Sequence, residues 1–438
     1  MKTDFFQTYF SAKIAVPMNL TEDMTTLAQD AKIASRQMTR LNTAEKNACL
    51  NAMANALERN SAEIQNANSR DMETGHSMEL SDALLDRLLI DEKRVTTMAL
   101  GLRKVAELED PVGRVLDKRE QPSGLKLKKV ACPIGVVVVI YESRPNVTAD
   151  AAGLCFKSGN ATILRGGKEA LNTNQIIARL IVEAGQQACN KFPANAVQVI
   201  PTTNRAAIPE LLSLTELVDL CIPRGGEGLI RAVAECSRVP VIKHYKGICS
   251  IYLDSAADPE KAIAVTINSK THRSGVCNAM ETLLVDHACA KQILPKVAEA
   301  LLCKGVELRC CEASQKLLGD KAKAATDEDW DTEYLDLICS VRVVDGVDGA
   351  LSHINTHGSG HTECIITEDE TTARRFQLEA DASTVFWNAS TRFSDGGEFG
   401  MGAEIGISTD KIGARGPMGL AELTTYKWLG EGDGLIRT

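Results

Sequence analysis

The pattern of apolar and polar positions changes character twice along the chain. Residues 21–109 are rich in Ala, Leu, Met, Glu and Lys, and this composition favours a series of helices. The segment 114–129 alternates basic and apolar side chains around turn-forming residues at 121–124, which predicts an exposed β-hairpin. Beyond residue 130, short apolar runs alternate with helical patterns, which predicts parallel sheets with right-handed crossovers.

The run 134–141 is the most strongly apolar part of the chain. It is rich in β-branched residues, and its length suits a strand that is buried on both faces. Further strands are predicted at 161–164, 197–200 and 218–222, and a second α/β segment is predicted over 251–388. A chain of 438 residues fits two or three domains of ordinary size, in agreement with two successive α/β segments.

Charge and cysteine content exclude several classes of protein. The formal net charge is −9 without a basic stripe, so the chain is expected to bind neither nucleic acid nor a membrane surface. The 14 cysteines show no C-x-x-C spacing, and no apolar segment has the length of a membrane span, so we expect reduced thiols in a cytoplasmic protein. Residues 1–20 lack a regular pattern and are predicted to form a disordered extension.

Two glycine-containing loops follow predicted strands and could hold a dinucleotide. In the first, two cations flank a Gly-Gly pair at 165–168, and an Arg at such a place can bind the 2′-phosphate of NADP. In the second, at 223–226, backbone N–H groups and a helix N-terminus could face a pyrophosphate. Each loop alone is equally consistent with a surface turn, but two such loops in one sheet favour a dinucleotide. The cofactor-binding candidates are Arg165, Gly166, Gly167, Lys168, Pro223, Arg224, Gly225 and Gly226.

Cys277 lies in a polar, glycine-containing loop that is unlike the setting of a core cysteine. His272 and Arg273 lie within five residues of it, and neighbouring cations lower the pKa of a thiol and raise its thiolate fraction. The alternative is an inert buried thiol, which is the expectation for the other cysteines. The polar context favours a nucleophile.

A polar segment with Arg144 and Asn146 follows the most apolar strand. Asn146 could donate an N–H to a developing oxyanion or cap the following helix, and the sequence context alone favours the cap. Arg144 could bind a carboxylate or a phosphate through two hydrogen bonds. The glycine-rich segment 392–404, with Arg392 and Glu404, either closes over a substrate or forms an ordered surface loop.

Three histidines, His353, His357 and His361, are spaced by four residues, as metal ligands on one helix would be. Gly358 and Gly360 would break a helix at this point, and no cysteine or carboxylate pattern completes a set of ligands. We therefore predict no metal site.

Six longer strings occur in order between Tyr141 and Trp428. Together they resemble those of one family, the glutamate-5-semialdehyde dehydrogenases of the aldehyde dehydrogenase superfamily. The helical N-terminal part is similar as well, so the resemblance covers nearly all of the chain beyond residue 20. The six strings are YESRPNVT, GNATILRGGKEA, IPRGGEGL, VCNAMETLLV, STRFSDGGEFGMGAEIGIST and ARGPMGLAELTTYKW.

The resemblance implies an α/β, aldehyde dehydrogenase-like fold. A Rossmann-type domain that binds NADPH is expected over 21–113 and 130–252, and an α/β catalytic domain is expected over 253–410. A small hairpin at 114–129, together with the tail at 411–438, is expected to join a homo-oligomer.

The resemblance also implies roles for individual residues. Cys277 falls on the catalytic cysteine of the superfamily, and Asn146 is expected to help to bind the oxyanion. Glu333 falls near a carboxylate that contacts the nicotinamide ribose. The residues that are expected to bind substrate are Arg144, His244, Arg392 and Glu404.

One departure from the wider superfamily concerns water. Hydrolytic aldehyde dehydrogenases carry a Glu that activates water, whereas the equivalent stretch here, 242–247, contains no carboxylate. Lys243, His244 and Lys246 in this stretch are better suited to attract phosphate. A thioester on Cys277 should therefore exchange with phosphate rather than with water.

The implied activity is the NADPH-dependent reduction of a small molecule, L-glutamate 5-phosphate, to its semialdehyde in proline biosynthesis. The lability of an acyl phosphate further implies a glutamate 5-kinase as a partner. Two other interpretations are an NAD-dependent hydrolytic aldehyde dehydrogenase and a non-catalytic scaffold on the same fold. The missing Glu argues against the first, and the cysteine loop with both phosphate-binding loops argues against the second.

Overall fold

The computed structural model describes residues 19–437 of the chain. The chain divides into two compact units. The first comprises residues 19–102 with Pro133–Cys221 and Ala232–Val241, and the second comprises Arg103–Cys132, Ile222–Arg231 and residues 242–437. The extension predicted over residues 1–20 lies almost entirely outside the described residues.

A four-stranded sheet in the order β5-β4-β3-β6 forms the centre of the first unit. β3 and β4 pair in parallel, with Val136 opposite Ala161, and β4 and β5 are also parallel. All residues of β3 are buried, in agreement with its unbroken β-branched run. The predicted strands are thus confirmed; their bounds are Val136–Tyr141 (β3), Ala161–Arg165 (β4), Val197–Val199 (β5) and Leu220–Arg224 (β6).

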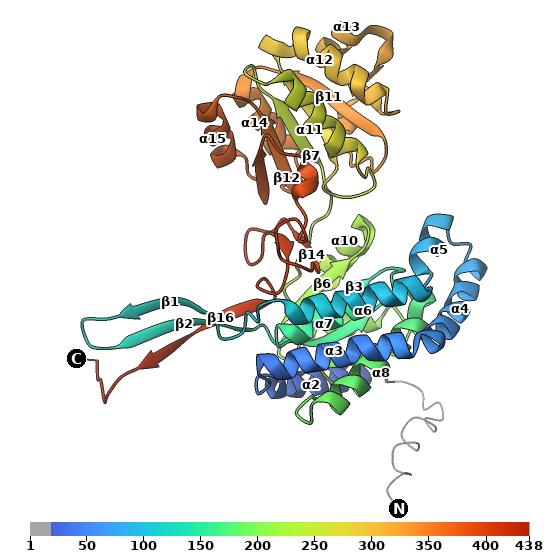
Figure 1. Ribbon diagram of the computed structural model, residues 1–438, viewed down its shortest axis with the longest axis vertical. Helices are drawn as coiled ribbons and strands as arrows, with labels where there is room; N and C mark the ends of the chain where they lie inside the picture. Colours follow the sequence, from blue (N-terminus) through green and yellow to red (C-terminus); the bar gives the residue numbers. More distant parts are fainter. Residues whose placement is uncertain (1–18, 438) are drawn as a thin grey trace, which may run out of the picture. The chain divides into compact units, whose positions relative to one another are not determined.

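Helices pack around this sheet (Figure 1). α3 begins with a capping box, in which the side chain of Asn42 accepts the N–H of Glu45 and the Glu45 carboxylate accepts the N–H of Asn42. α3 and α4 both pack against α8. The helices that lie wholly or partly in this unit are α2 Leu20–Met38, α3 Thr43–Arg59, α4 Ser61–Ser77, α5 Asp82–Leu88, α6 Glu92–Glu107, α7 Asn146–Lys157, η1 Lys168–Ala170, α8 Leu171–Ala188, α9 Ala207–Leu212 and α10 Glu227–Cys236.

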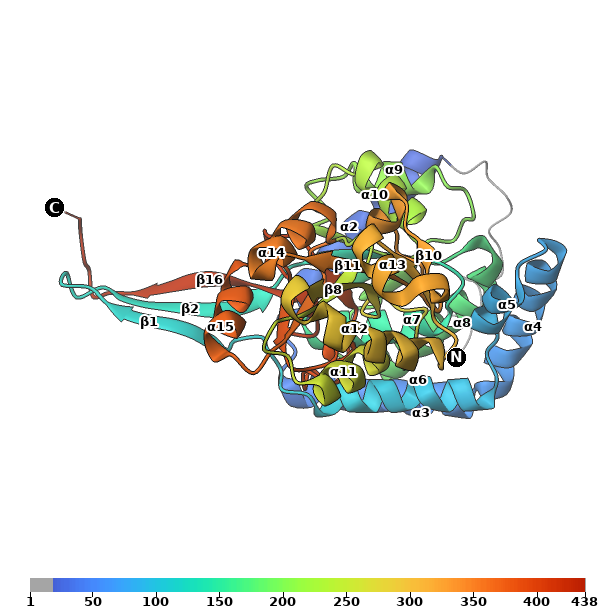
Figure 2. The ribbon, with the colours of Figure 1, turned by 90° about the horizontal axis from the view of Figure 1, so that it is seen from above.

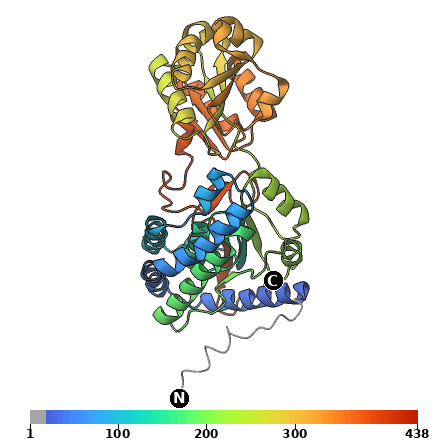
Figure 3. The same ribbon diagram turned by 90° about the vertical axis from the view of Figure 1, so that its right-hand side faces the viewer.

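A seven-stranded sheet in the order β10-β9-β11-β8-β7-β12-β13 forms the centre of the second unit. Every pair of neighbouring strands is parallel. Because side chains alternate between the two faces of a strand, Ile251 and Leu253 pack with α11 and α12, whereas Tyr252 packs with α14 and α15. Helices therefore cover both faces of the sheet (Figures 1 and 3).

The elements of the second sheet and of the loops after it complete the unit. The strands are β7 Cys249–Leu253, β8 Met280–Asp286, β9 Glu307–Cys310, β10 Lys323–Ala324, β11 Ile338–Val344, β12 Thr362–Ile366 and β13 Thr384–Trp387, followed by the antiparallel pair β14 Gly406–Ser408 and β15 Gly416–Met418. The helices are α11 Pro259–Thr271, α12 His287–Leu302, α13 Glu312–Leu318, η2 Gly319–Lys321, η3 Asp327–Asp331, α14 Gly346–His357, α15 Glu370–Glu379 and η4 Thr391–Phe393. Among residues 19–437, no helix combines the length and the apolar character that crossing a membrane requires.

The predicted hairpin is confirmed as part of a three-stranded ribbon. β1, Val115–Glu120, pairs antiparallel with β2, Lys126–Pro133, and β16, Thr424–Glu431, lies beside β2 (Figures 1 and 2). An ion pair of 2.9 Å between Lys128 and Glu431 links the hairpin to β16, and the ammonium of Lys129 lies 3.5 Å from the centre of the Tyr426 ring. The role of the ribbon in joining an oligomer stays a prediction.

Candidate active site

Cys277 lies in the loop between α11 and β8, and a second loop packs tightly against it. A Cβ atom at Gly247 would fall 2.0 Å from the carbonyl oxygen of Cys277, so only glycine fits at this position. The thiol of Cys249 donates to the same carbonyl oxygen over 3.2 Å. The backbone N–H of Gly247 donates to Glu333 over 2.9 Å. The fold of the second unit therefore brings Glu333 and the segment after His244 to the predicted nucleophile.

The electrostatic setting of Cys277 differs from the expectation. Burial, with the nearby carboxylates of Glu333 and Glu404, raises the pKa of the Cys277 thiol to about 12, whereas Arg224 lowers it. The expectation that neighbouring cations lower the pKa of Cys277 is therefore wrong. Loss of solvent is the largest cause, and the carboxylates of Glu333 and Glu404 add to it against the opposing charge of Arg224.

Removing the charge of Glu404 is expected to activate this thiol. Glu404→Gln should lower the pKa of Cys277 and speed its alkylation by iodoacetamide near pH 8 by about two- to tenfold, since one pKa unit changes the thiolate fraction tenfold. The glutamine oxygen can still accept the N–H of Gly396, which Glu404 accepts at 2.8 Å. Mass spectrometry of alkylated Cys277 over a pH series measures the effect. Glu398→Gln, at an exposed position of the same segment, is the control, and equal rates in both variants would contradict the assignment.

Arg224 lies nearer to the nucleophile than its predicted place under a pyrophosphate suggests. Its charge lowers the pKa values of Cys277 and of His244, and for His244 burial is the larger cause. Gly406 packs against it, because a Cβ there would come within 3.1 Å of the Arg224 Nη1 atom. Arg224 thus belongs to the surroundings of Cys277 as well as to the end of β6.

A buried polar layer lies behind Cys277, and sequence reasoning missed most of it. His361 and Glu363 are fully buried on and beside β12, and the Sγ atom of Cys249 lies 3.7 Å from the His361 Nδ1 atom. The ring of His361 meets the ring of His244 edge to face at 5.9 Å. Burial lowers the pKa of His361 to about 3 and raises the pKa of Glu363 to about 8, so the layer is largely uncharged at neutral pH. A Glu within an otherwise apolar strand pattern was the signal in the sequence.

His353, His357 and His361 do not converge on a common point. His353 and His357 have ring centres 4.7 Å apart on α14, whereas His361 faces Cys249 and His244. Within residues 19–437, no group of three or more His, Cys, Asp or Glu side chains could hold a metal ion.

Asn146 and Arg144 lie in the first unit, after β3. The interpretation of Asn146 as a helix cap is wrong: Pro145 occupies the cap position, and Asn146 is the first residue of α7. Its amide donates to the Asp150 carboxylate over 3.0 Å, which fixes the side chain and leaves its second N–H for another acceptor. Arg144 is exposed.

The loop 165–168 has the features of a phosphate cradle. Gly166 and Gly167 lie close to neighbouring side chains, because Cβ atoms there would lie 2.1 Å from the Asn174 amide and 1.8 Å from the Glu169 carboxylate. Burial and the neighbouring Arg205 both lower the pKa of Arg165. Two arginines that repel each other beside a glycine turn fit a ligand with a phosphate group, as the 2′-phosphate of NADP has.

Gly225 and Gly226 join β6 to α10, and Pro223 and Arg224 are the last residues of β6. A Cβ atom at Gly226 would meet no atom within 4 Å, so the space in front of this glycine is open. An open backbone at the start of a helix fits a pyrophosphate, because its N–H groups carry the positive end of the helix dipole.

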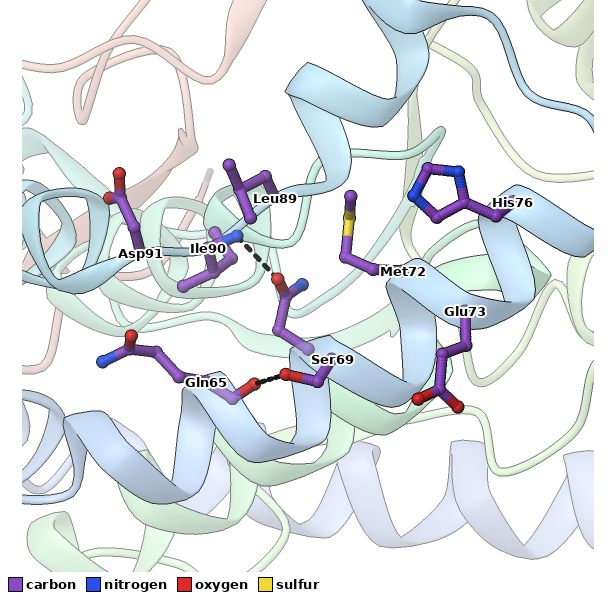
Figure 4. Close-up of a pocket in the computed structure, with 9 residues that line it drawn as sticks. Gln65, Ser69, Met72, Glu73, His76, Leu89, Ile90 and Asp91 are labelled. Atoms are coloured by element: carbon purple, nitrogen blue, oxygen red, sulfur yellow. Dashed lines mark hydrogen bonds between the residues drawn. The ribbon is translucent and has the colours of Figure 1, made fainter.

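A separate hollow of about 300 Å³ lies in the first unit between α4 and the residues before α6 (Figure 4). Asn68 stabilises its wall, since it accepts the N–H of Ile90 at 2.7 Å and donates to the carbonyl of Leu88 at 2.8 Å. None of the predicted site residues lines this hollow.

Comparison with known proteins agrees with this architecture. The model of the aldehyde dehydrogenase family matches residues 12–306. The chain therefore belongs to the aldehyde dehydrogenase family. The expected α/β fold is confirmed by an acetylating aldehyde dehydrogenase of Geobacillus thermoglucosidasius, with 18% identity over 96% of this chain and 98% of that chain and a TM-score of 0.64.

Two solved structures define the group within the family. The gamma-glutamyl phosphate reductase of Thermotoga maritima is 43% identical over 95% of this chain and 100% of that chain, with a TM-score of 0.92. The gamma-glutamyl phosphate reductase of Saccharomyces cerevisiae is 32% identical over 95% of this chain and 98% of that chain, with a TM-score of 0.52. Within its family, the chain groups with the gamma-glutamyl phosphate reductases, and it uses a nicotinamide cofactor of the NAD or NADP type, as the family does.

Proposed function

We propose that the chain reduces L-glutamate 5-phosphate to L-glutamate 5-semialdehyde and phosphate with NADPH, through a thioester on Cys277, as a cytoplasmic enzyme of proline biosynthesis. The observation that carries the proposal is the residue at position 244, where hydrolytic relatives need a Glu. His244 stands there, and burial together with the charge of Arg224 lowers the pKa of its imidazole. The identity to the two reductases gives independent support.

The two carboxylates near Cys277 are poorly placed to replace the missing base. Glu333 accepts the N–H of Gly247, and Glu404 accepts the N–H of Gly396. Burial raises the pKa of each carboxyl, but both carboxylates are engaged in positioning backbone. A thioester beside them is therefore exposed to attack by phosphate more than to activated water.

The protein's own groups account for each step at the acyl carbon. The Cys277 sulfur attacks the acyl carbon, the bond to the phosphate oxygen breaks, and phosphate leaves. The backbone N–H of Cys277 and the amide of Asn146 hold the oxyanion, and Arg144, His244, Arg392 and Glu404 bind the substrate. When bound, NADPH supplies the hydride that reduces the thioester. Cys277 then departs as the thiolate and releases the aldehyde.

The same proposal assigns the cofactor to the two glycine loops and Glu333. Arg165 with Lys168 binds the 2′-phosphate, Gly166 and Gly167 admit it, and the residues at 223–226 approach the pyrophosphate. The mutual repulsion of Arg165 and Arg205 supports a phosphate ligand, because an anion between them would relieve it. The full set is Arg165, Gly166, Gly167, Lys168, Pro223, Arg224, Gly225, Gly226 and Glu333.

Two partners belong to the proposal: a second copy of the chain and a glutamate 5-kinase. A second copy of the chain is assigned to the ribbon of β1, β2 and β16, where Val115, Leu116 and Leu429 are exposed apolar side chains. A glutamate 5-kinase is assigned as the source of substrate, because an acyl phosphate hydrolyses readily in water.

Phosphate dependence of the reverse reaction tests the proposed function. NADP reduction by the purified protein with glutamate semialdehyde should require inorganic phosphate, and the product should be an acyl phosphate that hydroxylamine traps. An equal rate without phosphate would identify water as the acceptor and would establish the hydrolytic alternative. If the protein binds NADP but does not reduce it either with or without phosphate, the interpretation as a non-catalytic scaffold is favoured.

A further inference from the structure

The turn η4 is fixed to the loop that carries the nucleophile. The hydroxyl of Thr391 donates to the carbonyl of Asn278 over 2.7 Å, and the amide of Asn278 donates to the carbonyl of Ser394 over 2.9 Å. The backbone N–H of Thr391 donates to Ser269 over 3.2 Å. Because these bonds hold both flanks of Arg392, they place this arginine beside the segment 269–278, which contains Arg273 and Cys277.

Arg392 and Arg273 lie close enough together for their charges to repel each other. Neither guanidinium forms an ion pair or a hydrogen bond with any residue in the described part of the chain, and the Nε atom of Arg392 is buried without a partner. Burial and the charge of Arg273 lower the pKa of Arg392, while Asp395 raises it. A buried donor without an acceptor is costly, so an anion at this place would stabilise Arg392. Arg273, whose side chain is exposed, adds a second positive charge there.

The lysines that the sequence suggested for phosphate are engaged elsewhere. Lys243 pairs with the Asp410 carboxylate at 3.0 Å, and Lys246 donates to the carbonyl of Asp331 over 3.0 Å. That Lys243, His244 and Lys246 attract phosphate stays a prediction, and of the two lysines only Lys243 has a carboxylate partner.

We propose that Arg273 and Arg392 together bind the phosphoryl group of the substrate, and inorganic phosphate in the reverse direction. The inference rests on the proposed function and adds the site of its leaving group. A phosphate dianion suits two guanidinium groups better than an α-carboxylate with one charge does. When the Cys277 sulfur bonds to the acyl carbon, the electron pair of the broken C–O bond stays on the phosphate oxygen. The two arginines stabilise that charge, and in reverse they present a phosphate oxygen to the thioester.

Steady-state kinetics of semialdehyde oxidation test this site, because phosphate and semialdehyde are separate substrates in that direction. Arg273→Ala should raise the KM for phosphate about tenfold or more, as expected for one lost charge-assisted hydrogen bond, and change the KM for semialdehyde less than about twofold. Arg392→Lys keeps the charge but loses the planar donor pair, so it should shift the same constant in the same direction. Arg374→Ala, on the exposed face of α15 and beside Glu370, is the control and should change neither.

The outcomes separate this inference from the proposed function. A rise in the KM for semialdehyde alone would mean that the arginines bind the α-carboxylate, and the inference would be overturned. If both KM values were unchanged in both variants while the wild type still required phosphate, the inference would be overturned and the proposed function would stand. Turnover of the wild type without phosphate would instead remove the proposed function, and the phosphate site with it.

Discussion

Cys277→Ala is expected to lower the rate of semialdehyde formation by at least about 10,000-fold. Without the sulfur no thioester can form, and the remaining groups can only bind the acyl phosphate and polarise it. The loop should keep its shape, since Gly247 and Cys249 contact the backbone of residue 277 rather than its side chain. NADPH consumption with freshly made glutamyl phosphate measures the rate.

A matched cysteine variant separates chemistry from folding. Cys303→Ala removes an exposed thiol that follows α12, and it should retain the activity of the wild type. Circular dichroism and NADPH affinity should be the same in both variants. If Cys277→Ala retained turnover within about tenfold of the wild type, another residue would be the nucleophile.

Much of the fold could be predicted because its signals are local. The β-branched run that became β3 is apolar at every position, and only a strand covered on both faces uses such a run. The hairpin of β1 and β2 could be located from its turn residues and alternating pattern. Cys277 stood out for the same reason, since its polar neighbours in the sequence are unlike those of a core cysteine.

The electrostatics of the site could not be predicted, because they depend on residues far apart in the sequence. Burial, and after it Glu333 and Glu404, raises the pKa of Cys277, and both effects arise only through the fold. The ion pair between Lys243 and Asp410 could not be predicted either, because the two residues are far apart in the sequence. The cap assignment of Asn146 failed because a proline took the cap position.

Breaking the buried ion pair between Lys270 and Glu281 is expected to destabilise the second unit most among the changes considered. Their charged atoms lie 2.6 Å apart, and both side chains are fully buried. Lys270→Met leaves the carboxyl of Glu281 alone in the core, at an expected cost of about 3–5 kcal/mol in the free energy of unfolding. Urea denaturation measures this cost. Lys316→Met, whose ion pair with Glu312 is exposed, should change stability by less than about 0.5 kcal/mol.

The pH dependence of the stability lost in Lys270→Met identifies the cause of that loss. Burial already raises the pKa of Glu281 to about 7, and Lys270 opposes this shift, so removing Lys270 raises the pKa further. A carboxyl with a raised pKa in the folded state stabilises the fold at low pH and loses that contribution as the pH rises. The deficit of Lys270→Met should therefore be larger above pH 8 than below pH 6, and Glu281→Gln in the same chain should remove the difference. If the lost stability of Lys270→Met did not depend on pH, altered side-chain packing would be its cause instead of charge. Glu281 also accepts the N–H of Leu335 at 3.2 Å, so the same carboxylate contacts the segment that carries Glu333.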